Sequence, residues 1–190
     1  MPSWIELRLA VLGLLRLARF DGDFQRFFDR SPNGALRSFW VAPIVLPYSV
    51  LAITQSGLRE RVGDMAQFTI TMAIGYTVLW VLPPAILTWV APLIGRDAEM
   101  PGCITVYNWM SLLTATTGLP LIALRMAGVA PDVIDVPSNI LLIVWLVWEA
   151  FLLKHALRIA MWQAVPASIA DYLFMQHLVL PMFLAAGSVT

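Results

Sequence analysis

Long apolar stretches alternate with short polar loops along almost the whole chain. A helix needs about 20 residues to cross a hydrocarbon core of about 30 Å, and five stretches approach or reach that length. They cover residues 38–56, 68–90, 103–124, 138–157 and 169–186. The pattern predicts an all-α fold, a polytopic membrane helical bundle with about five transmembrane helices within residues 31–190.

The N-terminal segment follows a different pattern, in which arginines interrupt an apolar helix. At 100° per residue, Arg8, Arg16 and Arg19 fall in one sector of about 80°, with an apolar face beside it. A helix of this kind lies in the membrane interface with its cations toward the headgroups. Residues 3–20 are thus predicted to form an interfacial amphipathic helix, inside a juxtamembrane segment of residues 1–30, and not a sixth span.

Serine and proline indicate where one predicted helix starts and where another is interrupted. Ser31 followed by Pro32 indicates a helix start, because Ser caps the N-terminus and Pro suits the first helical position. The pair Pro83 and Pro84 lies in the second half of the second span. Proline removes a backbone donor and clashes with the preceding turn, so we expect a kink or an unwound turn there.

The composition agrees with a membrane protein and excludes several functions. Hydrophobic residues make up 59% of the chain and charged residues 13%, against about 25% charged in a soluble domain. The net charge is zero, which gives no indication of nucleic-acid binding. One cysteine and two histidines form no ligand cluster of metal-site spacing, and no P-loop, GxGxxG or GxSxG motif is present. We therefore expect no cofactor and no enzymatic activity.

The distribution of basic residues predicts an orientation. With the N-terminus in the cytoplasm and the C-terminus outside, five spans place nine of the twelve basic residues on the cytoplasmic side. These nine are Arg8, Arg16, Arg19, Arg26, Arg30, Arg37, Arg96, Lys154 and Arg158. Such a bias is typical of cytoplasmic loops. The sequence predicts an integral protein of the bacterial inner (cytoplasmic) membrane, whose partners are the lipid bilayer and other membrane proteins or further copies of itself.

The third span carries a small and polar face. Asn108, Ser111, Ala115 and Gly118 recur at spacings of three, four and three residues, so they share one side of a helix. Such faces let neighbouring helices approach closely and form hydrogen bonds across the contact. We expect this span inside the bundle, with structural packing favoured over a polar lining.

Glu149 is the candidate site residue of the fourth span. Every other residue from 140 to 153 is apolar, which places Glu149 near the bilayer centre in a span of residues 138–157. A charged residue there costs at least about 2.5–3.5 kcal/mol, so it should face protein or water. It is either a proton, substrate or ion site, or a structural hydrogen-bonding group.

The sequence offers three candidate partners for Glu149 on other spans, namely Asn108, Ser111 and His177. Together with Glu149 they form a candidate intramembrane polar site. A histidine within an apolar segment is more often hydrogen-bonded in the core than a ligand, and His177 is interpreted in that way. No catalytic, cofactor-binding or metal-binding residue is predicted.

Three short stretches resemble a known family. Residues 28–34 (FDRSPNG), 38–40 (SFW) and 107–109 (YNW) resemble bacterial membrane proteins grouped with the Yip family of Rab-interacting integral membrane proteins. The resemblance implies five spans after a cytosolic, partly helical N-terminal segment. The eukaryotic members carry a motif of an acidic residue followed by Leu-Tyr-Gly-Pro, and this motif is absent here. The resemblance therefore carries over no GTPase-binding residues.

Two classes of function fit these features, and the sequence favours the first. The first is a non-enzymatic, Yip-like membrane protein that binds partners, acts as a scaffold or takes part in trafficking. The second is a small transporter or channel component that uses Glu149 as a proton or ion site. A water-filled cavity that reaches Glu149 would favour the second class.

Overall fold

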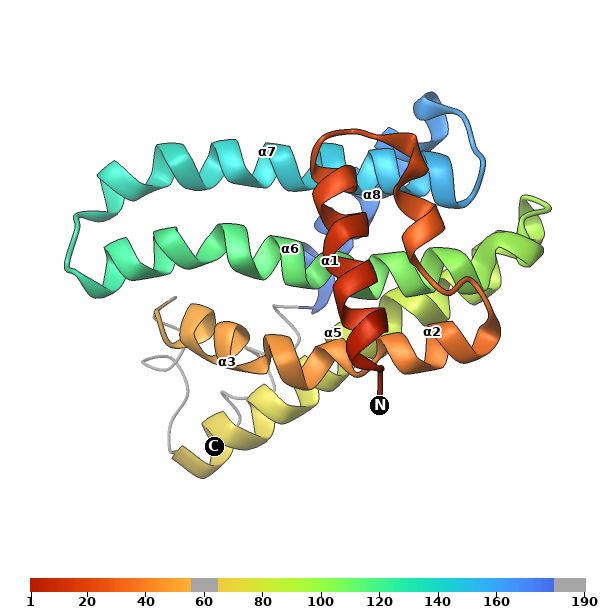
Figure 1. Ribbon diagram of the computed structural model, residues 1–190. Helices are drawn as coiled ribbons and strands as arrows, with labels where there is room; N and C mark the ends of the chain where they lie inside the picture. Colours follow the sequence, from red (N-terminus) through yellow and green to blue (C-terminus); the bar gives the residue numbers. More distant parts are fainter. Residues whose placement is uncertain (56–64, 180–190) are drawn as a thin grey trace.

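The computed structural model describes residues 1–55 and 65–179 of the 190-residue chain (Figure 1). These residues form helices and turns, with no strand among them, which confirms the predicted all-α class. In chain order the elements are α1 (Trp4–Ala18), η1 (Gly22–Phe27), α2 (Pro32–Ser38), α3 (Val41–Thr54), α5 (Met65–Leu93), η2 (Asp97–Glu99), α6 (Met100–Met126), α7 (Pro131–Ala156), α8 (Met161–Phe174) and η3 (Met175–Val179).

Three of the described helical segments are long and apolar enough to cross a membrane. They are Pro32–Thr54, Met65–Leu93 and Pro131–Ala156, and they contain most or all of the first, second and fourth predicted spans. The third predicted span lies within α6, a continuous 27-residue helix whose Thr, Asn and Ser content makes it more polar than these three. The fifth predicted span begins in α8 and η3, but residues 180–186 lie outside the described part of the chain.

Local sequence signals fix several helix ends. The Ser3 hydroxyl accepts a hydrogen bond from the Glu6 amide at 3.1 Å and so caps α1. The Ser31 hydroxyl does the same for the Gly34 amide at 3.1 Å, with Pro32 in the first turn of α2. The predicted helix start at Ser31 and Pro32 is therefore confirmed.

Of the two alternatives predicted at Pro83 and Pro84, the unwound turn is wrong, and the kink stays a prediction. α5 remains one α-helix of 29 residues through both prolines. The ring of proline fixes φ near −65°, which is a helical value, and only two backbone donors are lost. The remaining backbone hydrogen bonds on either side hold the helix together.

The longest helices, α6 and α7, form an antiparallel hairpin to which the other helices attach (Figure 1). α3 and α5 lie along α6, and α8 packs against α7. The core lies around the N-terminal half of α6 and the C-terminal half of α7, where Trp109, Val106 and Leu152 are fully buried.

α1 crosses this hairpin instead of running along it (Figure 1). Its 15 residues extend about 22 Å, less than the hydrocarbon thickness of about 30 Å. At its C-terminal end the Trp148 indole donates a hydrogen bond to the Ala18 carbonyl at 3.3 Å. Just beyond, Phe20 meets the Phe151 ring edge to face at 5.4 Å. These contacts attach the N-terminal segment to the C-terminal half of α7.

The small face of α6 points into the bundle. Asn108, Ala115 and Gly118 are buried, and Ser111 is half-buried. A Cβ atom at Gly118 would collide with the Tyr48 hydroxyl of α3, so the glycine allows this close approach. The expected role of this face in helix packing agrees with its contacts.

Candidate functional site

A cavity of about 560 Å³ lies among α5, α6, α7 and α8. Most of its wall is apolar, with α5 contributing Pro84, Leu87 and Val90 and α7 contributing Leu153. Among the described residues, two acidic side chains and no basic one line the cavity. The volume lies within the range of about 300–1,000 Å³ that is usual for small-molecule sites.

Glu149 and Asp171 are these two acids, and they meet across the α7–α8 contact. Glu149 lies on the buried face of α7 and is 9% exposed, next to the buried residue Ala150. Asp171 comes from α8, and its carboxyl group lies within hydrogen-bonding reach of that of Glu149. A hydrogen bond between two carboxyl groups requires that at least one of them carries a proton. The two acids are therefore placed so that they can share a proton.

Tyr107 adds a third polar group from α6. Its hydroxyl donates a hydrogen bond to the Asp171 carboxyl oxygen Oδ2 at 2.9 Å. Cys103, one turn earlier on α6, is fully buried and also lines the cavity. Tyr107 of α6, Glu149 of α7 and Asp171 of α8 thus all line the cavity.

No basic residue in residues 1–55 and 65–179 forms an ion pair with either acid. In the part of the chain that the structure describes, the five ion pairs are Arg16–Asp21, Arg26–Asp23, Arg37–Glu6, Arg37–Asp29 and Arg158–Glu99. All of them lie in the N-terminal segment and α2 or in the loops beside α6 and α7. Glu149 and Asp171 are therefore next to each other without a cationic partner among these ion pairs.

The structure places the predicted partners of Glu149 elsewhere. The Asn108 amide donates to the Ser38 hydroxyl at 2.8 Å, and Ser38 in turn donates to the Ala35 carbonyl at 2.7 Å. Ser111 is half-buried on α6, and His177 is exposed in the π-helical turn η3. None of the three predicted partners lines the cavity.

Asp171 and Tyr107 are the site residues that the sequence analysis missed. A signal for Asp171 exists, because it is an acid within a largely apolar helix, as Glu149 is. The signal for Tyr107 is weaker, since tyrosine is common in apolar helices. Only the packing of α6, α7 and α8 identifies the three as one site.

Within residues 1–55 and 65–179, no group of three or more His, Cys, Asp and Glu side chains could hold a metal ion. Comparison of the chain with protein-family models, curated proteins and solved structures finds no match. The candidate function therefore rests on the cavity and its acid pair.

Proposed function

We propose that this protein is a small membrane transport protein, or a component of one, whose Glu149–Asp171 pair takes up and releases a proton. The observation that carries the proposal is the cavity of about 560 Å³ that reaches both acids. Of the two classes that the sequence allowed, a cavity at Glu149 supports the one that uses this residue as a proton or ion site.

The surroundings of the pair favour exchange over a purely structural hydrogen bond. A structural pair would be enclosed by packed side chains, whereas this pair faces a space far larger than the roughly 30 Å³ that one water occupies in the liquid. Intramembrane acids that face a cavity are typical of proton relays. Tyr107 holds Asp171 in place without supplying a positive charge.

The N-terminal segment supports access from the cytoplasmic side. α1 meets α7 at Trp148, the residue before Glu149. If α1 lies in the membrane interface, as its arginines predict, Glu149 lies closer to that interface than to the bilayer centre. A proton would then travel only part of the hydrocarbon thickness to reach the pair from the cytoplasm.

The partner-binding class draws less support from the structure. The outer face of α7 exposes apolar residues, with exposed fractions between 41% and 64%, namely Val133, Val136, Ile140, Ile143 and Val147. Lipid accounts for such a face on a spanning helix, so it does not require a protein partner. The Yip-like interpretation stays a prediction from sequence.

Dissipation of a pH gradient in proteoliposomes tests the proposal. The purified full-length protein should relax the gradient faster than protein-free liposomes, as followed by an enclosed pH-sensitive dye. Glu149→Gln and Asp171→Asn should each remove this effect, whereas Asp135→Asn, at an exposed position near the other end of α7, should retain it. Equal relaxation in wild type, both acid variants and empty liposomes would contradict the proposal.

A further inference from the structure

We infer that the cavity binds a lipophilic organic cation of single positive charge, such as a protonated amine on an apolar body. This inference rests on the proposed function and names the class of substrate for the same site. It follows from the charge of the lining, the shape and polarity of the walls, the number of oxygen ligands and the position of the cavity.

The charge of the lining selects a cation. Glu149 and Asp171 are its acidic side chains, and no Lys, Arg or His of the described residues lines the cavity. With one shared proton, the pair carries one negative charge. In a cavity whose walls are apolar, one such charge is best matched by one positive charge, because an unpaired charge there is costly.

The side-chain oxygens alone do not complete the coordination of a divalent metal ion. Glu149, Asp171 and Tyr107 supply at most five oxygens from three side chains, and the Gln163 side-chain oxygen accepts from the Ala160 amide instead. Ca²⁺ takes six to eight oxygen ligands and Mg²⁺ keeps several waters in near-octahedral geometry, so either ion would need waters in a cavity with largely apolar walls. An ammonium group needs only a few acceptors, so it suits this donor set better.

The walls and the volume indicate an apolar body behind the charged group. Leu87, Val90 and Leu153 line the cavity. The cavity volume of about 560 Å³ is larger than a small inorganic cation would fill. Burial of apolar surface contributes about 25 cal/mol per Å². A ligand with hydrocarbon or aromatic groups would therefore gain affinity that a bare inorganic cation would not.

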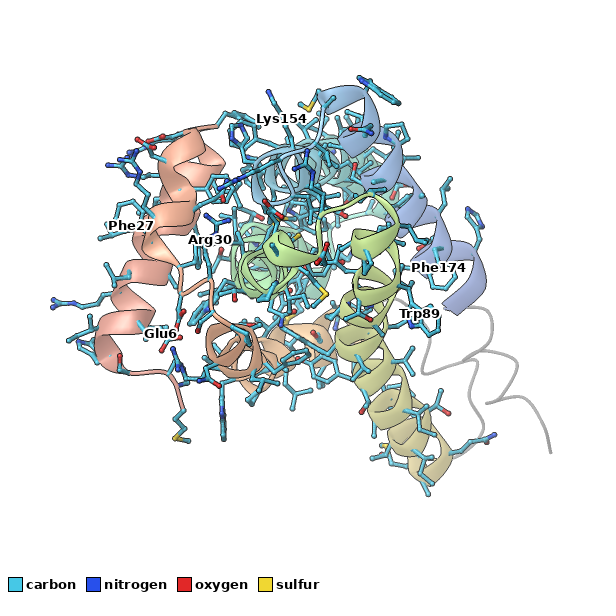
Figure 2. All side chains as sticks on the ribbon, turned by 90° about the vertical axis from the view of Figure 1, so that its right-hand side faces the viewer. Glu6, Phe27, Arg30, Trp89, Lys154 and Phe174 are labelled. Atoms are coloured by element: carbon cyan, nitrogen blue, oxygen red, sulfur yellow. The ribbon has the colours of Figure 1, made fainter. Side chains whose placement is uncertain are left out.

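The position of the cavity suggests entry from the bilayer. It lies between α5 and α8, and Figure 2 shows Trp89 of α5 and Phe174 of α8 in the space between these helices. Trp89 is 79% exposed, so this side of the protein is apolar on its outer surface. A lipophilic cation concentrated in the membrane could enter there without crossing a polar surface.

Two probe ions of matching shape and opposite charge test the inference. Tetraphenylphosphonium is a lipophilic monovalent cation, and tetraphenylborate is its anionic counterpart. Equilibrium binding is measured on the full-length protein in nanodiscs, with empty nanodiscs correcting for partition into lipid. We expect saturable binding of the phosphonium ion and none of the borate ion.

Variants separate the roles of charge and space. The double variant Glu149→Gln with Asp171→Asn should weaken phosphonium binding at least about tenfold. Ala167→Trp, one turn before Asp171 on the cavity wall, should also weaken it by filling the space, with both acids retained. Asp135→Asn should bind as the wild type does.

Equal binding of both probe ions would overturn the inference. So would an unchanged affinity for the phosphonium ion in the double variant and in Ala167→Trp. Because the pH-gradient experiment contains no organic cation, a positive result there together with absent phosphonium binding would refute the ligand class and leave the proton-exchange proposal standing.

Discussion

The Tyr107 hydroxyl of α6 donates a hydrogen bond to Asp171 of α8 at 2.9 Å, on the wall of a largely apolar cavity. This bond fixes the Asp171 carboxyl group beside Glu149 of α7. It therefore connects three helices through one cluster of side chains.

Removal of this hydroxyl should loosen the cluster. Tyr107→Phe keeps the ring but leaves Asp171 without one donor, and we expect a loss of about 1–3 kcal/mol in the free energy of unfolding. Unfolding in mixed micelles, followed by tryptophan fluorescence, measures the change. The matched control is Tyr172→Phe, which changes the residue after Asp171 on α8. It should change the free energy of unfolding little. Equal stability of the two variants would contradict the role assigned to Tyr107.

The bond between Asn108 and Ser38 should stabilise the packing of α2 on α6. Both side chains are buried, and the amide donates to the hydroxyl at 2.8 Å. Ser38→Ala leaves the Asn108 amide without this acceptor, which should reduce stability by about 1–3 kcal/mol. The half-buried Ser111 provides a comparison, because Ser111→Ala should cost less than about 0.5 kcal/mol. The same unfolding measurement would refute the assignment if the two substitutions had equal effects.

Gly118 should be sensitive to a single added methyl group. Its Cβ would meet the Tyr48 hydroxyl, so Gly118→Ala should destabilise the contact between α3 and α6 by about 1–3 kcal/mol. Tyr48→Phe removes the atom that would collide and should restore part of the loss. A double-mutant cycle measures this coupling. Strictly additive effects of the two substitutions would argue against the contact.

Asp29 should make the N-terminal segment sensitive to acid. Hydrogen bonds from the Ser31 backbone amide and hydroxyl, together with the neighbouring Arg37, lower the pKa of the Asp29 carboxyl group below its usual value. A lowered pKa means that the stabilisation is present above the unfolded-state pKa of about 3.9 and is lost as the pH falls through the folded-state value. Hydrogen exchange of residues 1–38 should therefore accelerate in that acidic range.

Asp29→Asn should remove this part of the pH dependence, because an amide does not titrate. Asp23→Asn is the control, since Asp23 forms only a surface pair with Arg26. An identical acid response in wild type and Asp29→Asn would show that the carboxyl group of Asp29 does not stabilise the segment.

Local sequence patterns predicted the elements of the fold better than the site. Ser31 and Pro32 begin a helix as expected, and the spacing of Asn108, Ala115 and Gly118 identifies the buried face of α6, because both signals depend on neighbours within a few turns. The pairing of Glu149 with Asp171 depends on how α7 and α8 pack, and no local spacing contains that information. No unwound turn forms at Pro83 and Pro84, because the backbone hydrogen bonds in the rest of the 29-residue helix compensate for the two lost donors.

Infrared spectroscopy of the carboxylic acid C=O stretch tests most directly whether Glu149 and Asp171 share a proton within reach of solvent. In the wild-type protein this band should shift on transfer to D₂O and change as the pH is raised. The double variant Glu149→Gln with Asp171→Asn should abolish this band, each single variant should shift its frequency because the remaining carboxyl group loses its partner, and Asp135→Asn should leave the band in place. A band that does not exchange with D₂O, or that survives both acid substitutions, would contradict a shared and accessible proton.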